Sequence, residues 1–532
     1  MGTLWYGGKI RTLQHETHVA EAVYVKNGKI VEVGTKTNLE DKFQTEITDY
    51  QAFRGVMYPG FVDSHLHMIG HGEKLIRLDL SEVCSIEQLN TVLKKAVDNT
   101  DPNTWVIGEG FNENLFPDKV VPNRLVLDKI STRHPIYLSR VCRHAAVTNT
   151  YGLQLANIHK QTENPPGGVI EKDEEGNPTG YLLDQAQELL KEVMPKKDFT
   201  YVKKALVKSL EDLYENGFVG GHTEDLFYYG DPVRTLTTFY EVIDGEQKKF
   251  RANLLVHHEA LQSILAHDQE DHPYVVLDSV KIFADGALGG RTALLSVPYS
   301  DDPTTSGVAI HSQEELDNIV QNARKVNMSV AIHVIGDLAL EYAVNSIEKY
   351  PVSKGKRDRL IHLQVTREDL IERLKKLSVV LDIQPRFVAS DFPWVQERLG
   401  EERMPYSFAW KTLLQAGLHC AGGSDAPIEP VNPLLGIHAA VTRRKLEETH
   451  EGYGSSEKLT LFESLQLFTN GSATAIGKEG ERGVIEEGYT ADFTVLSDDL
   501  FELEPDAWLN VQVYQTIVDN SIMYEKVEEP IR

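Results

Sequence analysis

A repeated alternation of strand-like and helix-like segments, between about residues 200 and 470, constrains what this chain of 532 residues can fold into. Buried strands that alternate with amphipathic helices form a parallel sheet. The tetrapeptides that begin at Ser312 and Thr366 resemble capping boxes, which mark helix starts. Eight candidate strands are found, at residues 60–63, 217–222, 252–257, 279–283, 329–333, 359–362, 379–384 and 418–422. The pattern therefore predicts an α/β protein with a (β/α)8 barrel.

Both ends of the chain are rich in short strands instead. Residues 1–58 contain two β-rich runs around Asn27 and Gly28, a strong hairpin signal, and residues 474–532 contain similar runs. We expect these two ends to form one small composite β-sandwich domain. The barrel domain would then occupy residues 59–473.

One interval interrupts the alternation. The distance from His67 to the next barrel strand is far too long for a single helix. Residues from about 73 to 200 include strand-like runs at 105–108 and 135–138 and a helix-like run at 181–193. These features predict an inserted subdomain after barrel strand 1. Insertions in such loops lie over the carboxyl-terminal face of a barrel, so we expect this one to shape the substrate pocket.

Charge and cysteine usage narrow the classes of function. The chain has 54 Lys and Arg residues against 80 Asp and Glu residues, a net charge of -26, which disfavours nucleic acid or an anionic membrane as a partner. Its three cysteines have no paired spacing, and neither an apolar leader nor a membrane-spanning run is seen. We therefore expect a cytoplasmic protein that acts on a small-molecule substrate.

Candidate metal ligands stand where the predicted strands end. His65 and His67 are two positions apart in an extended segment, so their side chains point to the same face. The other candidates are His333, His362 and Asp425, while Lys281 is a further charged residue on the apolar run of strand four and could simply pair with an acid. Each has an ordinary alternative, as a polar strand end, a hydrogen-bonded buried residue or a helix cap. Because strand ends converge on one rim of a barrel, the joint pattern favours a site for zinc or a similar divalent ion.

These motifs resemble the amidohydrolase superfamily, and the resemblance covers nearly the whole chain. It is carried by residues 59–67, by His333 and His362, and by residues 423–427. Residues 280–292, 332–337, 394–400 and 488–492 are similar to the YtcJ-like branch, which includes N-substituted formamide deformylase. The resemblance implies a distorted barrel, a β-sandwich from both termini, one or two divalent ions (usually Zn²⁺) and a homodimer. Lys281 matches a lysine that can be carboxylated to bridge two metals.

The chain departs from these relatives around the expected substrate pocket. Ile361 replaces a frequent glutamate, residues 140–144 replace the pattern Arg-x-Asp-Gly-His, and residues 110–112 replace Gly-Trp-Asp. The candidate substrate contacts are Asn112, Arg140, His144 and Arg291. Structural or surface charge is an equally good explanation for the charged members of this set.

The residues and the resemblance together predict a metal-dependent hydrolase that cleaves a non-peptide C–N bond in an amide, formamide or cyclic amide. A metal-activated water would attack, while Asp425 accepts its proton and passes it to the leaving amine. His333 and His362 would be ligands, with one of them free to stabilise the oxyanion. The alternatives are a deaminase or isomerase on the same fold, and a non-catalytic barrel scaffold. A scaffold has no need of this set of histidines and aspartate.

Overall fold

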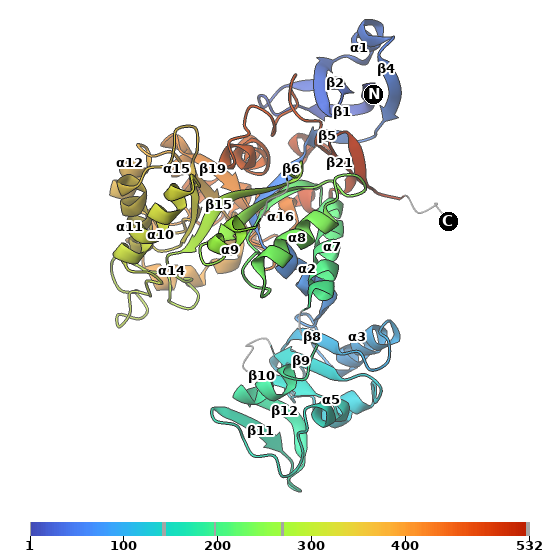
Figure 1. The fold of residues 1–532 in the computed structure, drawn as a ribbon, viewed down its shortest axis with the longest axis vertical. Coiled ribbons are helices and arrows are strands. Elements are labelled where there is room, and N and C mark those ends of the chain that lie inside the picture. Colours follow the sequence, from blue (N-terminus) through green and yellow to red (C-terminus); the bar gives the residue numbers. More distant parts are fainter. Residues whose placement is uncertain (1, 141–144, 196–197, 268–270, 528–532) are drawn as a thin grey trace. The chain divides into compact units, whose positions relative to one another are not determined.

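The computed structural model describes residues 2–140, 145–195, 198–267 and 271–527 (Figure 1). The chain divides into two compact units. The larger one contains Met1–Gly70 and Ser209–Arg532, and the smaller one contains His71–Lys208. The two units are described separately below.

Eight parallel strands form a nearly closed barrel in the larger unit, and each strand pairs with the next one along the chain (Figure 1). The strands are β6 (Phe61–Leu66), β13 (Phe218–Thr223), β14 (Arg251–His257), β15 (Val275–Phe283), β16 (Val330–Val334), β17 (Asp358–His362), β18 (Val379–Ile383) and β19 (His419–Gly422). Most of their residues are buried because helices cover the outside of the barrel. The predicted barrel is confirmed.

Helices separate these strands along the chain. α2 (Met68–Ile76) and α7 (Phe199–Glu215) connect the barrel to the smaller unit. The other helices of the barrel are α8 (Pro232–Val242), α9 (Leu261–Leu265), α10 (Gln313–Lys325), α11 (Asp337–Lys349), α12 (Glu368–Leu374), α13 (Phe387–Asp391), α14 (Trp394–Leu399), α15 (Trp410–Gln415), α16 (Pro433–Thr442), α17 (Leu461–Gln466) and α18 (Ser472–Ala475).

The two predicted capping boxes have different outcomes. At α10, the Ser312 hydroxyl accepts a hydrogen bond from the Glu315 backbone N–H, and the Glu315 carboxylate accepts one from the Ser312 N–H. The capping box at Thr366 is wrong, because α12 starts one residue later, with Arg367 as its N-cap. Thr366 is buried, and its N–H donates to the Tyr406 carbonyl at 2.9 Å. This bond ties Thr366 to a neighbouring segment instead of the helix.

The first and last barrel strands are joined through the loop that follows β19. The Asp425 N–H donates to the His65 carbonyl at 2.8 Å, and the His67 N–H donates to the Ala426 carbonyl at 2.7 Å. The buried Asp63 carboxylate accepts hydrogen bonds from the N–H groups of His65 (3.0 Å) and Ser424 (3.1 Å). These bonds hold the two histidines of β6 against the segment that carries Asp425.

Both ends of the chain contribute to a second sheet, of order β22-β21-β20-β5-β1-β2-β3, with β4 also paired to β1. Its strands are β1 (Gly2–Arg11), β2 (Val19–Lys26), β3 (Lys29–Gly34), β4 (Ile47–Ala52), β5 (Val56–Pro59), β20 (Phe493–Leu496), β21 (Val513–Val518) and β22 (Ser521–Glu525). Successive residues Leu4 and Trp5 enter different apolar clusters, and α1 (Lys36–Phe43) packs into the cluster of Leu4. Asn27 and Gly28 form the tight turn between β2 and β3, both with positive φ.

The smaller unit contains a six-stranded sheet of order β11-β12-β10-β9-β8-β7 with two apolar clusters. Its elements are β7 (Leu78–Asp79), α3 (Ile86–Asp98), β8 (Val106–Phe111), α4 (Arg124–Asp128), β9 (Ile136–Arg140), β10 (Ala145–Thr148), α5 (Thr150–Leu155), β11 (Gly168–Lys172), β12 (Pro178–Asp184) and α6 (Glu188–Lys191). The helix predicted at 181–193 is wrong at its start, because β12 alternates between buried and less buried residues and pairs with β10 and β11.

Within the described ranges, no helix combines the length and the apolar character needed to cross a bilayer.

Candidate metal centre

Three of the expected ligands converge at the carboxyl-terminal end of the barrel strands. His65 lies near the end of β6, His67 directly follows that strand, and Asp425 lies in the loop after β19. The Nε2 atoms of His65 and His67 are each 3.5 Å from Oδ1 of Asp425. One potential ligand atom from each residue lies within 4.8 Å of the other two. Two imidazole nitrogens and one carboxylate oxygen in this arrangement are suited to a divalent ion.

His333 and His362, near the ends of β16 and β17, lie beside this group. Their ring centroids are 4.5 Å apart, and the ring of His362 is 5.5 Å from that of His65. The backbones of His362 and Asp425 have positive φ values of 75° and 57°, a conformation that residues other than glycine rarely adopt. Such strain persists where the surrounding structure holds it, and it is concentrated at functional sites.

Hydrogen bonds orient the imidazole rings for metal binding. Nδ1 of His67 donates to the Glu224 carbonyl at 2.7 Å, and Nδ1 of His362 lies 2.7 Å from Oε1 of Gln384. A ring nitrogen that donates in this way leaves the other nitrogen with a lone pair for a metal. Burial also lowers the pKa of His362 to about 4 and that of His65 well below its usual value, so both rings are neutral at pH 7.

Lys281 lies in the barrel interior, next to the candidate metal ligands. Its side chain is completely buried in β15, and its Nζ lies 3.3 Å from Nε2 of His65. Burial lowers the pKa of Lys281 to about 8, although the charges of Glu224 and Asp425 act in the opposite direction. The amine therefore loses its proton more readily than a surface lysine does.

The carboxylates around His67 favour the presence of a positive charge at this position. Burial alone would lower the pKa of His67, but its hydrogen bond to Asp425 and the charges of Asp425, Glu224 and Asp225 raise it to about 9. Burial would raise the pKa of Asp425, but the hydrogen bond from His67 and the charge of His362 lower it overall. Carboxylate and imidazole groups together are a donor set that fits a divalent metal once His67 has lost its proton.

We expect metal binding to release a proton, and metal affinity to rise with pH up to about 9. A bound ion must displace the proton that His67 holds below its pKa of about 9. Calorimetric titration of the metal-free protein with Zn²⁺, in buffers of different ionisation enthalpy, measures this proton release. His67→Ala should remove most of the release, whereas His15→Ala, on an exposed residue, should not. An affinity independent of pH between about 6 and 8 would contradict the assignment.

The candidate substrate contacts are distributed over both units. In the smaller unit, the Arg140 guanidinium pairs with the Glu113 carboxylate at 2.7 Å, and the Asn112 side chain accepts a hydrogen bond from the Asn114 N–H. His144 lies outside the described residues. In the larger unit, Arg291 pairs with Asp301 at 2.7 Å in the loop after β15. The two arginines therefore have acidic partners within their own units.

Sequence reasoning missed three polar residues at the same rim. Glu224 follows β13, Gln384 follows β18, and His257 ends β14 with its ring stacked 4.3 Å from that of Phe227. The carboxylate of Glu224 is fully buried, with Oε2 3.8 Å from Nδ1 of His67. The strand-end position that selected the candidate ligands applies equally to these three residues. A search for every polar residue at a predicted strand end would therefore include all three.

Comparison with known proteins agrees with this geometry. The model of the Amidohydrolase family matches residues 55–524. The "Putative amidohydrolase YtcJ" of Bacillus subtilis (strain 168) is 47% identical over 99% of this chain and 100% of its own. The N-substituted formamide deformylase of Arthrobacter pascens is 25% identical over 97% of each chain. The crystal structure of an uncharacterized metal-dependent hydrolase from Pyrococcus horikoshii OT3 superposes with a TM-score of 0.77 at 27% identity, over 95% of this chain and 99% of that one.

The barrel, the candidate ligand set at its rim and these similarities place the protein among the metal-dependent hydrolases. More particularly, the chain belongs to the amidohydrolase family, which confirms the resemblance seen in its motifs.

Proposed function

We propose that this protein hydrolyses a non-peptide C–N bond in a small amide, formamide or cyclic amide. The observation that carries the proposal is the convergence of His65, His67 and Asp425 at the carboxyl-terminal end of the barrel, with Lys281, His333 and His362 beside them. The similarity to N-substituted formamide deformylase supports this bond type. A zinc ion is the proposed cofactor, because imidazole and carboxylate donors suit it.

The residues of the site have distinct roles in this proposal. His65, His67, His333 and His362 would hold the metal together with Asp425. When bound, a divalent ion activates water at neutral pH and polarises a carbonyl oxygen. Asp425 accepts the proton of the attacking water and delivers it to the nitrogen of the leaving amine. Its lowered pKa keeps the carboxylate ionised and ready to accept that proton.

Lys281 would hold a second ion after carboxylation. Its neutral amine attacks carbon dioxide, so that an N–C bond forms while one C=O π bond breaks to give a carboxylate, and the nitrogen releases one proton. The pKa of about 8 makes the neutral amine accessible near neutral pH. Protein prepared with carbon-13 bicarbonate should then show a carbamate signal by NMR, and Lys281→Met should lack it. A wild-type protein loaded with metal but free of this signal would exclude the modification.

A panel of substrates tests the reaction itself. Metal-loaded protein should release amine from N-formyl or N-acyl compounds or open a cyclic amide, and His65→Ala protein should not. Release of ammonia from aminated heterocycles alone would instead identify a deaminase. If the protein holds stoichiometric metal and turns over no member of the panel, the proposal fails.

A further inference from the structure

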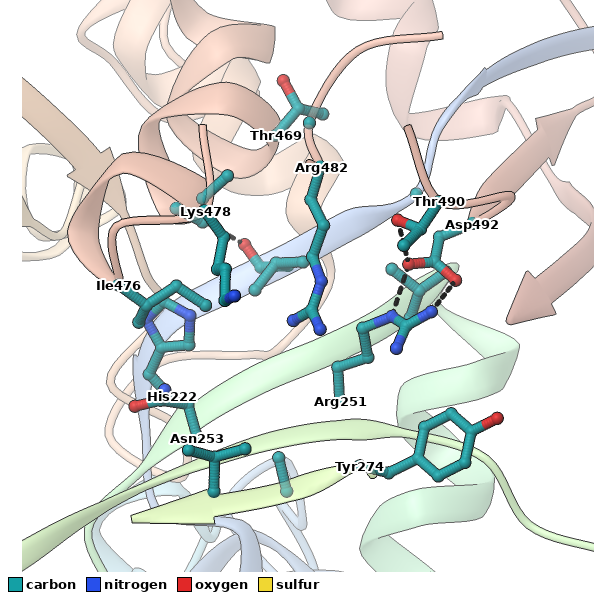
Figure 2. Close-up of a pocket in the computed structure, with 18 of the residues that line it drawn as sticks. His222, Arg251, Asn253, Tyr274, Thr469, Ile476, Lys478, Arg482, Thr490 and Asp492 are labelled. Atoms are coloured by element: carbon teal, nitrogen blue, oxygen red, sulfur yellow. Dashed lines mark hydrogen bonds and ion pairs between the residues drawn. The ribbon is translucent and has the colours of Figure 1, made fainter. Parts of the chain in front are cut away.

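A pocket separate from the metal centre lies in the larger unit (Figure 2). It has a volume of about 110 Å³ and lies between strands β6, β13, β14 and β15 and the segment 469–492 that leads to β20. None of the described residues assigned to the metal centre lines it. Its charged lining residues are Arg251, Asp278, Lys478, Arg482 and Asp492, and its other polar residues include His222 and Asn253.

Both carboxylates of this pocket have cationic partners other than Arg482, because Asp278 lies 3.5 Å from Arg359 and Asp492 pairs with Arg251. Asp492 is fully engaged, because the Arg251 guanidinium contacts it at 2.5 and 2.9 Å and the Asp519 N–H donates to it at 2.7 Å. Nε of Arg482 is buried and has no hydrogen-bond partner among the described residues. Figure 2 shows the Arg482 side chain directed into the pocket beside Arg251. Arg482 is therefore a cation without a hydrogen-bonded counterion at Nε.

Arg482 remains positively charged even though burial and the charge of Arg251 both disfavour its protonated form. Burial and the neighbouring charge of Arg251 lower the pKa of Arg482 to about 10, so the guanidinium stays protonated at pH 7. Lys478 adds an ammonium group to the lining, and its Nζ also contacts Glu481 at 2.9 Å. An anion placed between these groups would gain charge-assisted hydrogen bonds.

The same pocket contains two unused hydrogen-bond acceptors. His222 is 1% exposed and donates one ring N–H to the Ser64 carbonyl, while its Nδ1 has no partner among the described residues. Oδ1 of Asn253, which is 6% exposed, also has no partner within that part of the chain. Buried acceptors without partners are costly, so such atoms usually meet a ligand or an ordered water. Two acceptors beside a cation call for a ligand with both a negative charge and a hydrogen-bond donor.

We propose that this pocket binds a small carboxylate that also carries an O–H or N–H group, the chemistry of a short hydroxy acid or amino acid. The carboxylate contacts Arg482, with Lys478 beside it. The O–H or N–H group donates to Nδ1 of His222 or to Oδ1 of Asn253. Because the lining comes from both the barrel strands and the segment 469–492, a bound ligand connects them and stabilises the larger unit.

Glycolate and acetate test the proposal with intact, metal-loaded protein. Both have a carboxylate, but only glycolate has a hydroxyl donor. We expect glycolate to raise Tm and to bind several-fold more tightly than acetate in calorimetric titrations. Arg482→Gln should weaken glycolate binding at least tenfold, whereas Arg234→Gln, at an arginine that does not line the pocket, should leave it unchanged. Circular dichroism of each variant without ligand checks that it is folded.

Asn253→Leu provides a second, independent test. It removes one acceptor, so it should reduce the preference for glycolate over acetate while acetate still binds. The proposal is overturned if glycolate does not bind the wild-type protein, which would leave ordered water as the occupant. It is also overturned if Arg482→Gln binds glycolate normally, or if binding is lost only in His67→Ala, which would place the ligand at the metal centre.

Discussion

Asp425→Asn should lower kcat by about 10²- to 10⁴-fold, the usual contribution of a general acid–base group. An amide oxygen can still face the metal, but it cannot accept a proton from the attacking water or pass it to the leaving amine. The side chain is nearly isosteric, and the backbone bond from the Asp425 N–H to the His65 carbonyl is unaffected. Steady-state kinetics with a substrate identified from the panel measures the effect.

Metal content must be measured with these kinetics, because Asp425 is also a candidate ligand. Asp49→Asn is the matched control, since Asp49 lies on β4 in the sheet formed by the two chain ends, and its carboxylate accepts hydrogen bonds from Gln51. This control should keep full activity. Asp425→Asn protein that retains both its metal and its turnover would exclude the proton-transfer role. Loss of metal with loss of turnover would make Asp425 primarily a ligand.

The second large effect concerns stability. Arg359→Met should destabilise the larger unit by about 3–5 kcal/mol, because it leaves the Asp382 carboxylate buried without its partner. Both side chains are completely buried, with Nη2 of Arg359 2.7 Å from Oδ2 of Asp382. The same guanidinium donates to the Ser64 carbonyl at 2.6 Å, directly before His65. The midpoint of urea unfolding should fall, and metal affinity should fall with it.

A double variant distinguishes the stability lost through an unpaired buried charge from the stability lost through other contacts of Arg359. Arg359→Met combined with Asp382→Leu removes both charges, so it should recover part of the stability lost in the single variant. The carbonyl of Ser64 would still lack its hydrogen bond from Arg359, which keeps recovery incomplete. If the single variant unfolds at the wild-type urea concentration, the ion pair does not stabilise the barrel. Equal losses in the single and double variants would assign the effect to the hydrogen bond with Ser64.

The barrel could be predicted because its physical constraints repeat along the chain. Each strand is an apolar run, and the carboxyl ends of parallel strands share one rim, so His333 and Asp425 could be grouped without knowing any contact. Glu224 and Gln384 also stand at strand ends, but Glu and Gln are mostly exposed in proteins, so their residue types alone did not indicate buried positions. Only the fold shows that Glu224 is buried beside His67.

Elements whose structure depends on distant partners could not be predicted. Residues 181–184 have a helix-like local sequence, but they form the end of β12 because β10 and β11 supply hydrogen bonds on both sides. The ion pair between Arg140 and Glu113 could not be predicted either, because it depends on how two distant segments of the smaller unit fold together, and the role of Arg140 as a substrate contact stays a prediction. The pocket around Arg482 could not be predicted from the sequence either. Its polar atoms without hydrogen-bond partners come from strands β13 and β14 and from a segment more than two hundred residues later in the chain.

The seam between β6 and the loop after β19 has a consequence for the order of folding. Asp63 and Ser424 are 361 residues apart, so their contact forms only when nearly the whole barrel has been assembled. His65 and His67 stand on one side of that seam and Asp425 on the other. Metal uptake during refolding should therefore lag behind the gain of circular dichroism, and uptake that keeps pace with it would show that the ligands assemble early. The ion would therefore bind only chains in which β6 has already paired with the loop after β19, and it would stabilise the barrel in that closed state.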